Sequence, residues 1–315
     1  MSINLSSVDL TVRDKLELRI SQQLEFLLTV LQSVNESNAN PDIVYPLFCQ
    51  NLDLFDLDII KVLRNWTNAK FAELDRDRRR SKAIDLENFG NLIQQFLLGN
   101  KAVNIELSIE CYAHVLKIFT FSEDPENWGV IQNNLAAAYK ERIRGNKAEN
   151  LEQSIECYRA ALEVRNSETF PHEWAEIQIN LAQFSIENLG NYQIAIEHLQ
   201  SAYEHLLANN NDMGLLAQTM FEIARCFHQT GCLEQAKIYF KDSIRLYQRL
   251  EQPTQIAAAT SALGNLELQM GLLDDARLHL QTALEFYQAA GSLERVESIQ
   301  ELQQYLPVTS GAAGS

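Results

Sequence analysis

Two stretches of this chain repeat one another at an offset of 46 residues. The pentapeptide Ser-Ile-Glu-Cys-Tyr occupies 108–112 and again 154–158, and the tetrapeptide Gly-Asn-Lys-Ala occupies 99–102 and again 145–148. A fixed period of roughly 20 to 50 residues is typical of chains built from stacked copies of one small unit. The repeat therefore limits the possible folds more than any other feature of the sequence.

A small residue followed four positions later by a large apolar one recurs five times. Successive small residues are 46, 41, 41 and 40 positions apart. Further apolar residues follow at seven and eight positions, and this spacing places all of them on one face of an α-helix. The pairs are Ser108 with Tyr112, Ser154 with Tyr158, Ala195 with Leu199, Ala236 with Phe240, and Ala276 with Leu280.

A second pattern, a large apolar residue followed directly by a small one, precedes each of these segments. A small residue lets two helix backbones approach closely, so each unit is predicted to be a pair of packed helices. Gly231 and Gly271 would form the turn in the last two units. One such hairpin cannot bury its apolar face alone, so neighbours must stack. The pairs are Phe89-Gly90, Leu135-Ala136, Leu181-Ala182, Ile223-Ala224 and Leu263-Gly264.

These two patterns resemble the tetratricopeptide repeat family, although the units are longer than that family's standard of about 34 residues. The resemblance implies an all-α fold, a solenoid of helix hairpins that follows a right-handed superhelix. The segments 131–136 and 170–175 are similar to a bacterial, notably cyanobacterial, subgroup. Some members of that subgroup continue into a caspase-like CHAT protease domain, whereas the helical run here is expected to end near Leu306.

The chain is expected to divide into four regions. Residues 1–80 do not match the repeat and should form an N-terminal helical cap, since an open solenoid end would expose apolar surface. Residues 84–290 should form five hairpins, 291–306 a C-terminal capping helix, and 307–315 a disordered tail. The apolar stripe expected on the first helix of the cap is Leu16, Ile20, Leu24, Leu27, Leu28 and Leu31.

The charge balance excludes several classes of partner. The formal net charge is -16, which disfavours nucleic acid and anionic membranes. No apolar run reaches the roughly 18 residues of a membrane span, and the N-terminus lacks the layout of a secretion signal. Five cysteines, an odd number, suggest reduced thiols, so a cytoplasmic location is expected. Cys49, Cys226 and Cys232 are predicted to be buried or partly buried.

A single basic cluster interrupts this acidic sequence. It runs from Arg76 to Arg80, with one aspartate inside it, and Lys82 follows. Two interpretations remain open. The cluster is either a solvated connection between the cap and the repeats, or a docking point for an acidic partner.

No pattern in the sequence indicates catalysis. There is no glycine-rich phosphate loop, and the six histidines are scattered over different units, outside the spacings that bind zinc. We therefore predict no catalytic residue, no cofactor and no metal site.

The groove of the solenoid is the predicted functional site, because the first helices of the hairpins should line its concave wall. Asn88, Asn134 and Asn180 occupy one repeat position and could bond the backbone of an extended peptide; ordinary surface polarity or an interhelical hydrogen bond are the alternatives. Trp128 and Trp174 are instead expected in the core between repeats. The residues predicted to face a partner are Asn88, Asn91, Gln94, Asn134, Lys140, Asn180, Gln183, Arg225, His228 and Asn265.

Three hypotheses of function follow from the sequence. The favoured one is a non-catalytic scaffold or adaptor that holds a partner peptide or protein segment. The alternative is a regulatory subunit or domain of an enzyme, such as a caspase-like protease. A peptide-responsive transcription regulator would need a DNA-binding head, and residues 1–80 carry no excess of basic side chains to form one.

Overall fold

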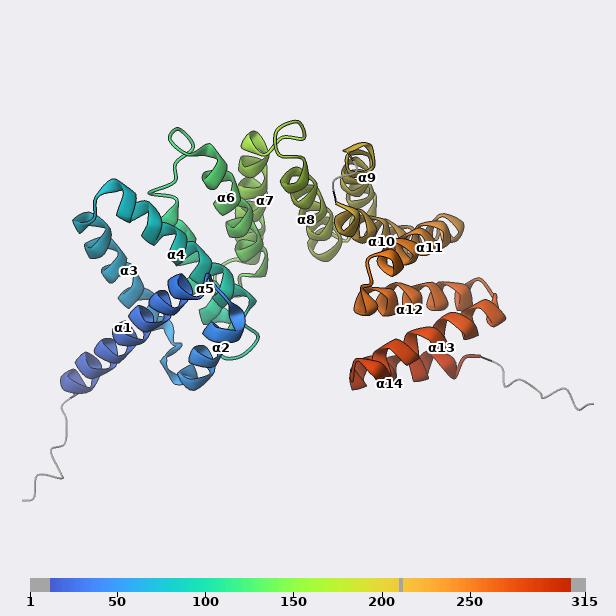
Figure 1. Cartoon of the computed structure of the whole chain (residues 1–315), viewed down its shortest axis with the longest axis horizontal. Coiled ribbons are helices and arrows are strands. Elements are labelled where there is room, and N and C mark those ends of the chain that lie inside the picture. Colours follow the sequence, from blue (N-terminus) through green and yellow to red (C-terminus); the bar gives the residue numbers. More distant parts are fainter. Residues whose placement is uncertain (1–11, 210–211, 307–315) are drawn as a thin grey trace, which may run out of the picture. The chain divides into compact units, whose positions relative to one another are not determined.

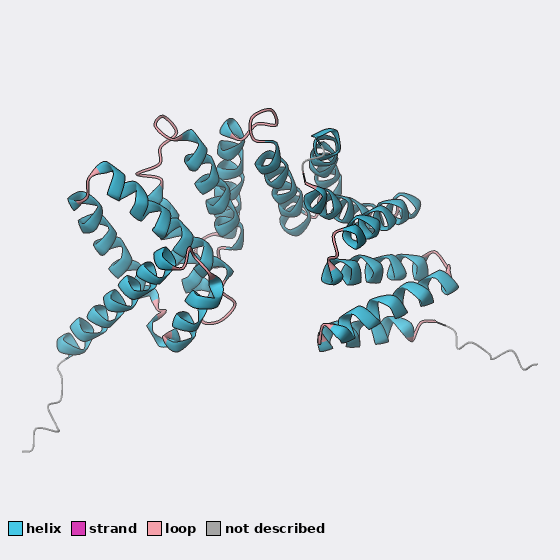
Figure 2. Ribbon diagram, in the orientation of Figure 1, coloured by secondary structure: helices cyan, strands magenta, loops and turns pink. Residues whose placement is uncertain are grey.

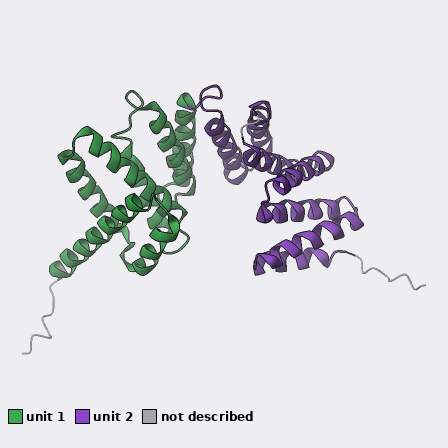
Figure 3. Ribbon diagram, in the orientation of Figure 1, with its two compact units in different colours: residues 1–164 green, residues 165–315 purple. Residues whose placement is uncertain are grey.

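The computed structural model describes residues 12–209 and 212–306, and within these ranges every regular element is a helix (Figures 1 and 2). This confirms the predicted all-α fold of helical repeats. The chain forms two compact units, residues 1–164 and 165–315 (Figure 3). The expected tail at 307–315 lies outside the described residues. No described helix is long and apolar enough to cross a membrane.

The first unit contains two hairpins, preceded by residues 12–73, which the sequence predicts to be a cap and which we call the cap segment. In the hairpins, α4 packs on α5 and α6 packs on α7. Helix α1 contacts α4, and α3 contacts α5. Pro125 opens α6, where its missing N–H costs nothing. The elements are α1 (Val12–Glu36), α2 (Pro41–Gln50), the 3-10 turn η1 (Leu52–Leu54), α3 (Leu57–Glu73), α4 (Arg76–Gln95), α5 (Lys101–Val115), α6 (Pro125–Glu141) and α7 (Lys147–Val164).

Aromatic rings join the cap segment to the first hairpin. The ring of Phe48 on α2 lies 5.1 Å from that of Phe96 and 6.0 Å from that of Phe89 on α4, measured between centroids. Phe55 lies 5.5 Å from the same Phe48 ring and 5.3 Å from Phe26 on α1. Edge-to-face pairs of this kind add to the free energy gained by burying the rings.

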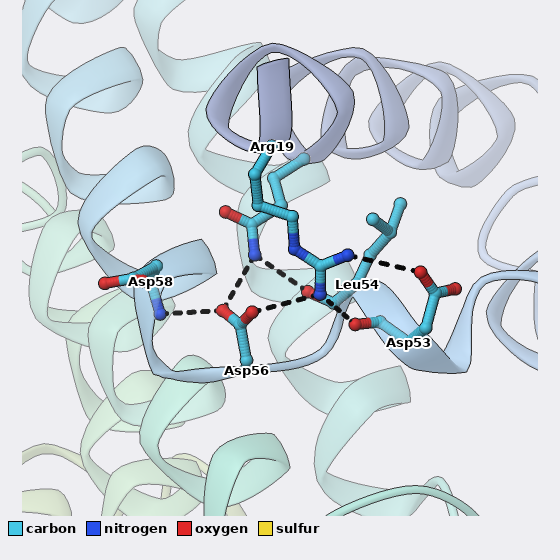
Figure 4. A network of polar contacts seen from close by, with 6 residues as sticks. Arg19, Asp53, Leu54, Asp56 and Asp58 are labelled. Atoms are coloured by element: carbon cyan, nitrogen blue, oxygen red, sulfur yellow. Dashed lines mark hydrogen bonds and ion pairs between the residues drawn. The ribbon is translucent and has the colours of Figure 1, made fainter. Parts of the chain in front are cut away.

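A polar network fixes α1 against the segment that links η1 to α3 (Figure 4). The guanidinium of Arg19 contacts Asp53 and lies 3.0 Å from an Asp56 carboxylate oxygen. The Gln23 amide, which is fully buried, donates to the Leu54 carbonyl at 3.0 Å and to Asp56 at 2.8 Å. Asp56 also caps α3 by accepting the Asp58 N–H, so one carboxylate orients two helices.

The apolar stripe predicted on α1 was wrong for three of its six residues. Leu16, Ile20 and Leu28 are 50%, 41% and 42% exposed, whereas Leu27 and Leu31 are buried. The buried face also contains Gln23, Phe26, Val30 and Val34. The neighbouring helices cover only part of the apolar stripe. The periodicity therefore predicted the helix correctly, but not which of its residues are buried.

The second unit contains three hairpins and a final helix. Each hairpin pairs consecutive helices, and α13 also packs on α14. Gly231 and Gly271 have φ of +80° and +73° at the predicted turns, a conformation that glycine adopts without steric cost. The helices are α8 (Pro171–Leu189), α9 (Tyr192–Asn209), α10 (Met213–Gln229), α11 (Leu233–Arg249), α12 (Pro253–Gln269), α13 (Leu273–Ala289) and α14 (Leu293–Gln303).

Two further sequence predictions need correction. Cys49 is exposed rather than buried, because Val44 and Phe48 already form the buried face of the short helix α2.

Trp128 and Trp174 are only partly buried: the Trp128 ring lies against Phe121, and the Trp174 ring against His205. Of the two, Trp174 packs against the core of the second unit.

Candidate functional site

A cavity in the second unit brings together side chains from several helices. Its volume is about 570 Å³, within the range of about 300–1,000 Å³ typical of ligand sites. Helices α10 and α12, the first helices of two successive hairpins, supply more than half of its lining, and α14 borders it. It is lined by Ile186, Tyr192, Phe221, Arg225, Cys226, His228, Gln229, Phe240, Ala258, Ser261, Ala262, Asn265, Tyr287, Arg295 and Leu302.

Three of the predicted partner-facing residues meet in this cavity. Arg225 and Asn265 each follow the small residue of a first helix, and His228 comes one turn after Arg225. The small residues Ala224 and Gly264 are buried, so the residues that follow them are turned toward the cavity. His228 Nε2 lies 2.9 Å from Gln269 Oε1, which connects α10 to α12 at the rim.

Every ionised side chain in the lining is cationic. Arg225 and Arg295 line the cavity, and no aspartate or glutamate does, although the chain carries a net charge of -16. The Arg225 guanidinium is 54% exposed and lies 3.0 Å from Glu222, one turn earlier on α10. Burial raises the pKa of Glu222, and Arg225 opposes that rise. The cavity therefore presents positive charge and hydrogen-bonding groups over an aromatic floor.

Tyr287 lines the same cavity as the two arginines. Burial raises the pKa of its phenol, and the charge of Arg295 opposes the rise. Both residues line the cavity, Tyr287 from α13 and Arg295 from α14. The sequence indicated neither residue as part of the site: Tyr287 lies on a second helix, and Arg295 lies on α14, which is outside the repeat.

Another three predicted residues form an internal network in the first unit. The Tyr112 hydroxyl lies 2.7 Å from Asn91 Oδ1 and 2.9 Å from Gln94 Oε1. Asn134 on α6 donates from Nδ2 to the same Asn91 oxygen at 3.1 Å. For Asn134, the structure thus shows the interhelical hydrogen bond that was one alternative to a peptide contact. Tyr112 belongs to this network, although its position in the repeat indicated only a core residue.

The remaining predicted residues are partly exposed on the first helices. Asn88 lies on α4, Lys140 on α6, and Asn180 and Gln183 on α8. They do not line the cavity of the second unit. In the part of the chain that the structure describes, no three His, Cys, Asp or Glu side chains are grouped so that they could hold a metal ion.

Family models identify the repeat in both units. A tetratricopeptide repeat model matches residues 173–249 and 215–289, and a second tetratricopeptide repeat model matches residues 129–168. Together they cover most of the last four hairpins. No curated protein matches the sequence.

Solved structures show the same fold at low sequence identity. Aspartyl phosphate phosphatase F from Bacillus subtilis is 16% identical with a TM-score of 0.61, over 97% of this chain and 82% of that one. RapI in its apo form is 14% identical with a TM-score of 0.55, over 90% of this chain and 72% of that one. Rap protein complexed with competence and sporulation factor is 14% identical with a TM-score of 0.52, over 90% and 86%.

The matched models, the stacked hairpins and these similar folds agree on the nature of the repeat. The chain is a tetratricopeptide repeat protein.

Proposed function

We propose that this protein is a non-catalytic scaffold and that the cavity of its second unit holds a segment of a partner polypeptide. The observation that carries the proposal is the lining, in which two successive first helices present Arg225, His228 and Asn265 to one space. Side chains presented at intervals along a groove suit an extended chain, whose backbone and side chains can be bound at successive points.

The polarity of the cavity indicates an acidic segment. Arg225 and Arg295 supply positive charge with no carboxylate in the lining, and a guanidinium binds carboxylates through two parallel hydrogen bonds. Asn265 and Gln229 can bond a peptide backbone, and Phe221 and Tyr287 can contact apolar side chains. A partner with acidic residues beside an aromatic or aliphatic one would use all of these groups.

The similar structures support the fold, but they do not identify the partner of this chain. Rap protein forms a complex with competence and sporulation factor, but a likeness at 14% identity concerns the fold alone. The proposal therefore depends on the cavity of this chain. The five free cysteines suit a reducing compartment, and we place the protein in the cytoplasm with a protein or peptide partner rather than nucleic acid.

Selection from a random peptide library displayed on phage tests the proposal. The wild-type protein should enrich acidic peptides, and Arg225→Gln with Asn265→Ala should weaken their binding by about tenfold or more. Arg295→Gln should weaken it as well, without leaving the buried Glu222 unpaired. Arg245→Gln is the matched control, because Arg245 is an exposed arginine on α11 paired with Asp242 outside this cavity.

A triple variant separates this site from the asparagine positions. If Asn88→Ala, Asn134→Ala and Asn180→Ala together leave peptide binding unchanged while the Arg225 and Asn265 variant loses it, the cavity of the second unit is the site. The opposite result would move the site to the asparagines. Failure to enrich any peptide would refute the proposal as a whole.

A further inference from the structure

A second cavity, in the first unit, is surrounded by the basic cluster that the proposed function does not use. Its volume is about 300 Å³, and it is lined by Arg76, Arg79, Arg80, Lys117, Ile118 and Glu123. The arginines come from the first turns of α4 and the lysine from the segment that follows α5. Four cations and one carboxylate thus face one small space, in a chain whose net charge is -16.

Two of these cations have carboxylate partners. Arg80 pairs with Asp124, and its guanidinium also lies 4.8 Å from the centre of the Phe119 ring. Arg76 lies 3.7 Å from Glu123, and both of these side chains are mostly exposed, so this pair is weak. Arg80 is therefore held in place by residues between α5 and α6, whereas Arg76 is held only loosely.

The other two cations lack a carboxylate partner among the described residues. Arg79 donates from Nη2 to the Leu74 carbonyl at 2.9 Å, and its Nε is buried with no acceptor. Lys117 Nζ lies 3.4 Å from His114 Nδ1, a ring nitrogen without negative charge. Arg78, by contrast, pairs with Asp75 at 3.5 Å and does not line the cavity. The cavity therefore carries about two uncompensated positive charges.

We propose that this cavity binds a phosphate group, either as the free ion or as a phosphorylated side chain of a peptide. A phosphate monoester carries close to two negative charges and three acceptor oxygens at neutral pH, which matches the charge left by Arg79 and Lys117. Arginine offers a planar fork to such oxygens, and lysine a compact charge. Arg79 is anchored at Leu74, so little side-chain freedom would be lost on binding.

Calorimetric titration of the full chain at low ionic strength tests this site. The ligands are inorganic phosphate, a short phosphoserine peptide, and the same peptide without phosphate. We expect saturable binding of phosphate or of the phosphopeptide, and none of the unphosphorylated peptide. If the phosphopeptide binds more tightly than inorganic phosphate, the ligand is a phosphorylated partner. If the two bind equally, the ligand is the free ion, and either result supports the site.

Variants distinguish phosphate binding in the cavity from nonspecific attraction of phosphate to a basic surface. Lys117→Gln should weaken phosphate binding by about tenfold, and because Lys117 is exposed this variant should fold normally. Arg79→Gln should weaken it further, with thermal unfolding checked because Arg79 also bonds Leu74. Arg78→Gln should leave binding unchanged. An equal loss in Arg78→Gln and Lys117→Gln, or no saturable binding to the wild type, would overturn the proposal.

Discussion

The Tyr112 ring on α5 occupies the space that a side chain at Gly90 on α4 would need. A Cβ atom built on Gly90 would stand 2.9 Å from Tyr112 Cε1 and 3.1 Å from Cys111 Cβ. The last hairpin repeats this relationship, since a Cβ on Gly264 would stand 2.8 Å from Leu280 Cγ and 3.3 Å from the Leu280 backbone nitrogen. In these two hairpins the large residue of the second helix therefore packs onto the small residue of the first.

Gly264→Ala tests this close approach. The substitution should destabilise the protein by about 1 to 3 kcal/mol through overpacking, even though alanine is intrinsically the better helix former by about 1 kcal/mol. Urea unfolding measures the change. In a Leu280→Ala background the same substitution should cost less, because the atoms at 2.8 and 2.9 Å are gone and only the backbone nitrogen at 3.3 Å remains. An equal cost in both backgrounds would show that Leu280 is not the obstacle.

The repeat could be predicted from sequence because it depends on pairs of this kind. Gly90 and Gly264 hold the small position of a first helix, and Tyr112 and Leu280 the large position of the second, so both contacts lie inside one hairpin at matching repeat positions. The orientation of α1 did not follow in the same way. Its buried face includes Gln23, whose amide nitrogen donates to Leu54 and Asp56 from a distant segment, and no local pattern shows such a partner.

The candidate site was only partly predictable for a related reason. Repeat position placed Arg225 and Asn265 on the face that lines the cavity, because that face is a property of the helix. It also selected Asn134, whose amide bonds Asn91, 43 residues earlier. Whether a polar side chain is free for a partner depends on such neighbours across helices. Arg295 was missed because it lies beyond the last full repeat.

The glycine turns give a second prediction. Gly271 has φ of +73°, and no atom lies within 4 Å of the place where its Cβ would stand, so only the backbone conformation restricts this position. Gly271→Ala should cost about 1 to 2 kcal/mol, and Gly271→Asn less, since asparagine tolerates the left-handed region better. Thermal unfolding of both variants measures this difference. Equal effects would mean that the turn relaxes to another conformation.

Glu87 on α4 should make the protein less stable as the pH rises. Burial raises its pKa to about 7 from an ordinary 4.5, so between these values the folded state holds a proton that the unfolded chain has lost. The stabilisation is complete below pH 4.5 and disappears as the pH rises through 7. Glu87→Gln should remove this dependence and stabilise the protein at pH 8 by about 2 to 3 kcal/mol. Urea unfolding at pH 5 and pH 8 provides the measurement, and a pH dependence that persists in Glu87→Gln would contradict this assignment.

Glu110 on α5 should have the opposite dependence. Burial alone would raise its pKa, but hydrogen bonds from Arg64 and His114 outweigh burial and lower the pKa to about 2. Arg64 on α3 binds it with Nε at 2.8 Å and Nη2 at 2.6 Å. The stabilisation is therefore present above the ordinary value of 4.5 and is lost as the pH falls toward 2.

Arg64→Gln tests whether this pair attaches the cap segment to the first hairpin. We expect a loss of about 1 to 2 kcal/mol at pH 7, less than the full shift would give because Arg64 is half exposed and solvent screens the pair. The loss should shrink toward zero near pH 2, where the wild type also loses the carboxylate charge. Arg13→Gln is the control, since Arg13 pairs with Glu17 across one turn of α1 with both side chains mostly exposed. Such a pair contributes little, so an equal loss in the two variants would show that surface charge in general, rather than the contact between α3 and α5, determines the effect.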